Sequence, residues 1–196
     1  NSMIEKEKKL DVDAHVTTVL FNDQYKMLYN RRELKDVRKM TDKDYTPGGM
    51  TALLDAVGRT IHKMDMVSGI HRKDKGNKVL FVIITDGEEN DSREYTYADV
   101  KKLIKDRQEN AGWEFIFLGA NIDAAAAAEN LGIDRDRAVK YKNTGSGVRA
   151  NFKAVAELSD SLAKSGRVSD EWKETVEKDE DDAADKQSAA VTLHRR

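Results

Sequence analysis

Apolar residues recur along the chain in two alternating patterns, one typical of strands and the other typical of helices. Short runs rich in β-branched and aromatic residues predict strands, and these cover residues 15–21, 24–29, 79–84, 113–118 and 138–141. Apolar residues three or four apart predict helices between them, over 51–66, from 92 to about 112, over 122–130, and in a last helix capped by Thr144 or Ser146. Strands that alternate with helices favour right-handed crossovers and a mainly parallel sheet. The pattern therefore predicts an α/β fold in three layers, with helices on both faces of the sheet.

The first two predicted strands are an exception to the parallel arrangement. Only the turn-forming residues Asn22 and Asp23 separate them, and so short a connection joins antiparallel neighbours. The sheet is therefore expected to carry one antiparallel strand at its edge.

Residues 78–95, KVLFVIITDGEENDSREY, combine a continuous apolar run with an acidic loop. Strands that helices cover on both faces have such a sequence, so we expect a buried parallel strand here. Ligands of open α/β sheets bind beyond the carboxyl ends of the strands. Three polar loops are expected at that edge, over residues 48–51, 85–90 and 119–121. A binding site is therefore predicted where these loops meet.

Composition narrows the class of protein. The 196 residues include no cysteine, which excludes a disulfide framework, thiolate zinc sites and a cysteine nucleophile, and fits the cytoplasm. No apolar stretch approaches the ~18 residues of a membrane span, and no signal-peptide pattern is present, so no membrane partner is expected. The formal net charge is −2, which does not favour nucleic-acid binding. One local basic cluster is more simply a solvated edge of the domain; it comprises Arg31, Arg32, Lys35, Arg38 and Lys39.

The composition changes from about Gly166 onward. An acidic run over residues 179–182 and the small polar residues after it cannot bury enough apolar surface to become ordered. We therefore expect a domain over residues 1–165 and a charged, flexible tail over 166–196. Within this tail, only Trp172 and Val176 are expected to pack, as a short helix.

Two motifs resemble the von Willebrand factor A family: GGMTALLDAVGRTI, followed by VLFVIITDGEEN. The later segment GWEFIFLGANIDAA resembles a bacterial and phage branch of that family, and the resemblance covers roughly residues 1–165. It implies a Rossmann-like, three-layer α/β sandwich that acts as a protein-binding module in adhesion or scaffolding. Family members bind a divalent cation, Mg²⁺ or Mn²⁺, at a metal-ion-dependent adhesion site formed by three loops.

The resemblance also implies particular residues for this site. The threonine of the second loop corresponds to Thr51, and the aspartate of the third loop corresponds to Asp86. An Asp or Glu carboxylate of a partner protein would complete the metal shell. The partner would contact the surface around these two residues, namely Gly48, Gly49, Met50, Gly87, Glu88 and Asn121.

The chain departs from the family at its first motif. No Asp-x-Ser-x-Ser sequence occurs, although the family carries it at the end of its first, central strand. In the family strand order 3-2-1-4-5-6 that strand would lie between residues 15–21 and 79–84. We therefore expect an N-terminally incomplete domain, with residues 4–10 as the second half of a helix. Two unpaired sheet edges would then favour self-association, and the metal site would be incomplete.

Other interpretations of the same residues remain open. Asp86 with Glu88 or Glu89 could serve a Mg²⁺-dependent hydrolase or phosphoryl-transfer enzyme, although no nucleophile, phosphate-binding loop or Asp-x-Asp pair accompanies them. The chain could also be an inactive fragment of a phage or mobile-element protein. In simpler structural roles, Asp86 would cap its own loop, Thr51 would cap the following helix, and Glu88 and Glu89 would be solvated.

Overall fold

The computed structural model describes residues 4–5, 8, 13–41, 43–44, 46, 48–66, 78–168, 172–174 and 176. Within these residues the strands form two sheets. The first pairs β1 (His15–Phe21) with β2 (Tyr25–Glu33) in antiparallel fashion. The second is parallel, in the order β3-β4-β5 (Leu80–Thr85, Glu114–Ala120 and Ala138–Tyr141). The described strands therefore form an antiparallel pair and a separate, three-stranded parallel sheet.

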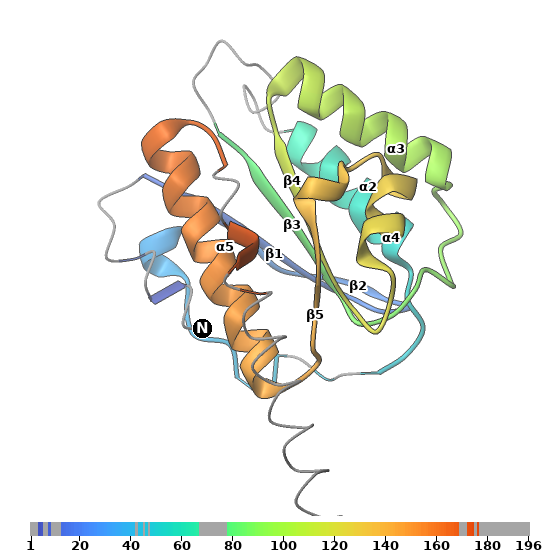
Figure 1. Cartoon of the computed structure of the whole chain (residues 1–196), viewed down its shortest axis with the longest axis horizontal. Coiled ribbons are helices and arrows are strands. Elements are labelled where there is room, and N and C mark those ends of the chain that lie inside the picture. The colour runs from blue at the N-terminus through green and yellow to red at the C-terminus, as the bar shows by residue number, and fades with distance from the viewer. Residues whose placement is uncertain are drawn as a thin grey trace, which may run out of the picture.

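Helices cover both faces of the parallel sheet (Figure 1). On one face lie α2 (Leu53–Asp65), α3 (Tyr97–Asp106) and α4 (Ala124–Leu131), and on the other lies α5 (Gly145–Ser165). A π-helical turn at Arg107–Ala111 extends α3, and 3-10 turns occupy Leu34–Asp36 and Arg135–Arg137. The arrangement is mixed α/β and compatible with an α/β sandwich, as the periodicities predict.

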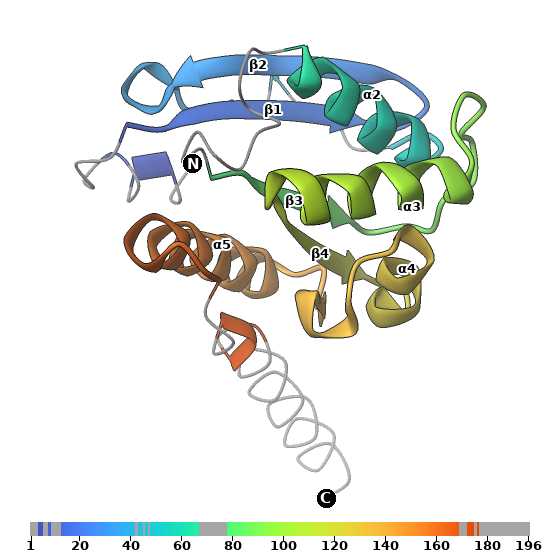
Figure 2. The same ribbon diagram turned by 90° about the horizontal axis from the view of Figure 1, so that it is seen from above.

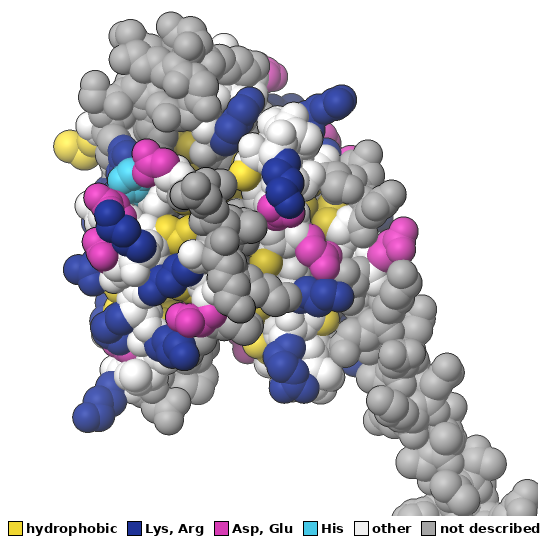
Figure 3. Space-filling model, turned by 90° about the vertical axis from the view of Figure 1, so that its left-hand side faces the viewer, with side chains coloured by type: hydrophobic (Ala, Val, Ile, Leu, Met, Phe, Trp, Pro, Cys, Tyr) yellow, Lys and Arg dark blue, Asp and Glu magenta, His cyan; other side chains and the backbone are white. Residues whose placement is uncertain are grey.

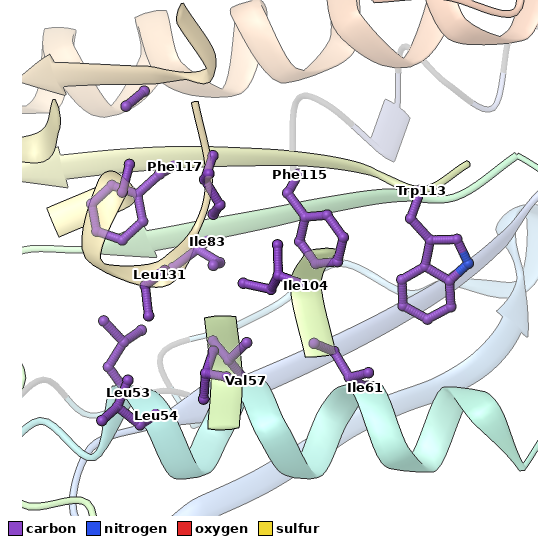
Figure 4. Packing of buried hydrophobic residues seen from close by; sticks show 14 of the residues in the cluster. Leu53, Leu54, Val57, Ile61, Ile83, Ile104, Trp113, Phe115, Phe117 and Leu131 are labelled. Carbon is purple, nitrogen blue, oxygen red and sulfur yellow. The ribbon is translucent and has the colours of Figure 1, made fainter. Parts of the chain in front are cut away.

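The side chains of β4 alternate between two hydrophobic clusters. Phe115 and Phe117 point toward α2, α3 and α4, where they pack with Ile83 of β3, Ile104 of α3 and other buried residues (Figure 4). Ile116 and Leu118 point to the opposite face and pack against α5. All four side chains are essentially inaccessible to solvent, and full burial of each contributes about 1.5–3 kcal/mol. This central strand therefore fixes the layers on both of its faces.

Two element boundaries differ from the prediction. Strand β2 continues to Glu33 instead of ending near Tyr29, because an edge strand with one solvated face tolerates charged residues such as Arg32. Helix α3 begins at Tyr97, where Thr96 and Asp99 form a capping box, and not at Ser92. Tyr97 lies in the first turn and is 43% exposed.

Packing continues beyond residue 165. Val168, Trp172 and Val176 are all buried in the second cluster, beside Leu158 of α5. Most of the remaining tail lies outside the described residues, as does most of the N-terminal helix expected over residues 4–10. In the part of the chain that is described, no helix is both long and apolar enough to cross a bilayer.

The surface is mixed in charge, both on the face drawn in Figure 3 and around the predicted basic cluster. Figure 3 shows Lys and Arg side chains interspersed with Asp and Glu on one face of the molecule, with hydrophobic side chains between them. Within the cluster, Lys35 pairs with Glu33 at 2.6 Å, and Arg38 pairs with Asp44. Two of the five basic side chains of the cluster are therefore paired with neighbouring acids.

Candidate functional site

The carboxyl ends of the strands meet at one edge of the molecule. Asn22 follows β1 directly, and its carbonyl oxygen accepts a hydrogen bond from Ala52 N (2.8 Å). Its side-chain amide donates to the Gly48 carbonyl oxygen (2.9 Å). Gly49 approaches this turn so closely that a Cβ would lie 2.6 Å from Asp23 Oδ1, and its φ of +93° also favours glycine. The Gly48-Gly49 loop therefore anchors the start of α2 to the end of β1.

Thr51 joins this loop to the end of β3. Its Oγ1 lies 3.2 Å from the position that a Cβ would take on Gly87. Its backbone N–H donates to Asn90 Oδ1 (2.8 Å), and its carbonyl oxygen accepts from Asn90 N (3.0 Å). The structure thus brings the Thr51 loop and the Asp86–Gly87 loop together. Helix α2 has Ala52 at its N-cap position and no side-chain cap, so the helix-capping role considered for Thr51 is wrong.

The Asp86 side chain is exposed and has a partner that the sequence interpretation missed. Its Oδ2 accepts a hydrogen bond from Asn143 Nδ2 (3.2 Å). Asn143 follows β5 by two residues, so the strand-end rule that selected Asp86 also placed this asparagine at the same edge. Asn121, at the end of β4, is exposed and adopts a left-handed backbone with φ of +58°.

Glu89 is a structural residue rather than a solvated loop acid. Its Oε2 accepts from Leu54 N (2.9 Å) and Ser92 Oγ (2.7 Å), while Oε1 accepts from Ser92 N (2.8 Å) and Asp91 N (3.1 Å). Leu54 N is one of the free donors of the first turn of α2, where a negative charge is stabilised. The solvated role considered for Glu89 is therefore wrong. Because all of these hydrogen bonds hold its carboxylate within the loop, Glu89 is poorly placed for the enzyme chemistry considered above. Glu88, in contrast, is exposed, as expected of a solvated loop acid.

Asp55 holds the other half of the same loop. This buried carboxylate accepts hydrogen bonds from the backbone N–H groups of Arg93 (3.0 Å), Glu94 (2.9 Å) and Tyr95 (3.0 Å). Burial by itself would raise the pKa of Asp55, but the three N–H donors outweigh it and the pKa is lowered. Asp55 and Glu89 thus fix residues 89–95 against α2. Asp55 also lines a cavity of about 290 Å³. Some of the other polar residues that line this cavity are paired with one another, as Arg59 is with Glu94.

Two apolar side chains border the acidic edge. Met50 is 50% exposed beside Thr51, and Tyr97 is 43% exposed at the start of α3. Partial burial, followed by the nearby charges of Glu89 and Glu88, raises the pKa of the Tyr97 hydroxyl. The edge therefore carries the exposed carboxylates of Asp86 and Glu88 beside these two partly exposed side chains.

The donors at this edge fit a divalent cation in part. Mg²⁺ prefers oxygen ligands and usually retains several waters, so one hydroxyl and one carboxylate are the right types but an incomplete set. Within the described residues, no group of three or more His, Cys, Asp or Glu side chains could hold an ion. A cation here would depend on Thr51, Asp86 and ligands from outside these residues.

Comparisons of the chain with protein-family models, with curated proteins and with solved structures found no match.

Proposed function

We propose that this chain is a protein-binding module of the von Willebrand factor A type, which binds its partner through the carboxyl edge described above. The observation that carries the proposal is the junction of Thr51 with the Asp86–Gly87 loop. The resemblance assigns residues 48–51 and 85–90 to one metal site, and hydrogen bonds between Thr51 and Asn90 join these two loops. The surrounding surface is exposed at Gly48, Gly49, Met50, Glu88 and Asn121.

In this proposal a divalent cation, Mg²⁺ or Mn²⁺, bridges the module and its partner. Thr51 and Asp86 would supply one hydroxyl and one carboxylate, and a partner Asp or Glu would supply a further carboxylate. Met50 and Tyr97 would contribute apolar contact beside the ion. Asn143 would orient the Asp86 carboxylate through its hydrogen bond.

The enzyme alternative receives less support. The Glu89 carboxylate is fully engaged by the loop and the start of α2. Among the described residues, the Asp86 side chain is hydrogen-bonded to an asparagine amide, and not to a hydroxyl or imidazole that it could activate as a nucleophile. A binding role requires only that the Asp86 carboxylate is exposed, and it needs no nucleophile beside it.

Calorimetric titration with Mg²⁺ and Mn²⁺ tests the proposed site. We expect weak binding by the chain alone, with a Kd in the millimolar range, because only part of the shell comes from the protein. The Asp86→Ala variant should bind the cation at least tenfold more weakly, since it lacks the only carboxylate assigned to the ion. Thr51→Ala should weaken binding by a smaller factor.

A matched control is Asp136→Asn. Asp136 is an exposed acid in the turn before β5, at the opposite edge of the parallel sheet. This substitution therefore removes one negative charge, as Asp86→Ala does, but leaves the proposed site unaltered. Its cation affinity should equal that of the unaltered chain. A silent titration at tens of millimolar metal would contradict the cation-bridged mode and favour the inactive-fragment interpretation.

A further inference from the structure

A cavity of about 290 Å³ lies where β1 turns into β2 and helix α2 begins (Figure 2). Its walls come from the β1–β2 turn, from one face of the start of α2, and from the loop after β3. The lining residues are Asp23, Gln24, Tyr25, Ala52, Asp55, Arg59, Asp91, Arg93 and Glu94. Neither Thr51 nor Asp86 is among them, so the cavity is separate from the proposed cation site.

The lining of the cavity has an uncompensated negative charge. It contains four acids and two arginines, which gives a formal charge of −2. Arg59 forms two hydrogen bonds with the carboxylate of Glu94 (2.7 and 2.5 Å). Arg93 forms one with Asp91 (3.1 Å). An anion that entered the cavity would compete with these acids for the two arginines, whereas a cation would meet the net negative charge.

The two other acids differ in what they offer a ligand. Asp55 is buried and already accepts three backbone hydrogen bonds, so it contributes mainly its charge. Asp23 is exposed, and within the described residues no hydrogen bond or ion pair engages its carboxylate. The Gln24 side chain and Asp91 Oδ2 are likewise not hydrogen-bonded to any described residue. Free acceptors therefore lie on two walls, the β1–β2 turn and the loop after β3.

The spacing of these acceptors suits an organic cation. A divalent metal ion requires several oxygen ligands within about 2.0–2.6 Å of one point, and the acids of this cavity do not form a group of three that could hold one. A guanidinium group has five N–H donors spread over a plane, so it can pair with one carboxylate through two hydrogen bonds and still reach a second wall. The volume lies just below the range of ligand pockets, about 300–1,000 Å³, and suits a single side chain.

We infer that this cavity binds the guanidinium group of an arginine side chain of the protein partner. The Asp23 carboxylate forms the main ion pair, and Gln24 and Asp91 supply further acceptors. That the guanidinium belongs to a protein rests on the proposed function, which assigns a protein partner to the adjacent edge. Ala52 of the cavity wall follows Thr51 directly in the chain, so one partner surface can cover both places.

Acetyl-arginine-N-methylamide tests the inference, titrated against the ¹⁵N-labelled chain in metal-free, low-salt buffer and followed by NMR. We expect saturable shifts with a Kd on the order of 1 mM, because one side chain makes few contacts. The shifts should centre on the backbone amides of residues 23–25 and 91–94. The citrulline counterpart is the matched control, since it keeps the shape but lacks the charge, and it should bind at least tenfold more weakly. The lysine counterpart should bind at least threefold more weakly, because an ammonium is a point charge.

Asp23→Asn tests the main ion pair on the side of the protein. Because Asp23 is exposed and makes no other described contact, the variant should fold as the unaltered chain does. It should bind acetyl-arginine-N-methylamide about tenfold more weakly. Asp136→Asn removes one negative charge at the opposite edge of the parallel sheet, and its affinity for the ligand should be unchanged.

Several results would overturn the inference. They are the absence of shifts at tens of millimolar arginine ligand, equal binding of the citrulline ligand, shifts centred outside the cavity, and full affinity of Asp23→Asn. Tighter binding of n-butylguanidinium, which lacks a peptide backbone, would identify a small molecule as the occupant instead of a partner arginine. Because the buffer contains no metal, failure here leaves the proposed cation site standing, and a silent cation titration leaves a positive result here standing.

Discussion

Replacing Asp55 by asparagine is expected to destabilise the chain by about 2–3 kcal/mol at neutral pH. The carboxylate accepts three backbone hydrogen bonds from residues 93–95, and a hydrogen bond to a charged group contributes about 1.5–3 kcal/mol net of the exchange with water. Asparagine keeps the shape but loses the charge and turns one acceptor into a donor, which faces the backbone N–H groups. Thermal unfolding should show a Tm lower by about 5–10 °C.

The pH dependence separates this role from a general packing defect. The folded-state pKa of Asp55 is lowered, so its stabilisation is complete above the unfolded-state pKa of about 3.9 and is lost as the pH falls through the lower folded value. The difference in unfolding free energy between the original chain and Asp55→Asn should therefore shrink below about pH 4. Urea unfolding of both proteins between pH 3 and pH 7 measures it.

Asp91→Asn is the control for this prediction. Asp91 pairs at 3.1 Å with Arg93, whose side chain is largely exposed, and exposed pairs contribute at most about 1 kcal/mol. Equal losses of stability in the two variants, or a difference that does not change with pH, would contradict the anchoring role of Asp55.

Most helices and strands can be predicted from local periodicity, because the apolar positions that define the periodicity are also the positions that pack in the core. The apolar run at residues 79–84 lies on β3, and the stripe of α2 contains the buried residues Leu53, Leu54, Val57 and Ile61. The charged end of β2 was missed because pairing with β1, and not composition, keeps Arg32 in a strand opposite Val16. Tertiary pairing of this kind overrides local preference.

Some residues of the candidate site can be predicted from the sequence, and others cannot. The strand-end rule and the motif resemblance select Thr51 and Asp86, and the same rule could have selected Asn143. Asp55 and Glu89 carry no such signal, because a helix position and a loop acid look solvated until the backbone N–H groups of a distant segment are placed around them. The hydrogen bonds that Asp55 accepts span 38 to 40 residues, beyond any local pattern.

The turn from β5 to α5 links stability to the geometry of Asp86, and Gly147→Ala tests that link. A Cβ at position 147 would lie 2.1 Å from the carbonyl oxygen of Lys142, far inside van der Waals contact. That oxygen also accepts the N–H of Thr144 (2.8 Å), whose Oγ1 in turn accepts from Gly147 N (3.2 Å). The backbone of residues 142–144 must therefore move to admit the methyl group.

Two effects of opposite sign compete in this variant. Alanine is favoured over glycine in a helix by about 1 kcal/mol, whereas forced overpacking with a backbone shift costs about 1–3 kcal/mol and can cost more. Because the clash is with backbone rather than with a flexible side chain, we expect a net loss of about 2 kcal/mol. The displaced turn should also release Asn143 from Asp86, so any cation affinity should fall at least threefold. Unfolding by urea and calorimetric titration measure the two effects.

Gly145→Ala isolates the steric cause, since it adds the same methyl group two residues earlier in the same helix. Its Cβ would lie 3.3 Å from Arg149 Nη1, the end of a flexible side chain that can turn away. Stability should stay within about 0.5 kcal/mol of the original chain, with cation affinity unchanged. If both variants behaved alike, the Lys142 carbonyl contact would not be the constraint, and the position of Asn143 would not depend on the packing of this turn.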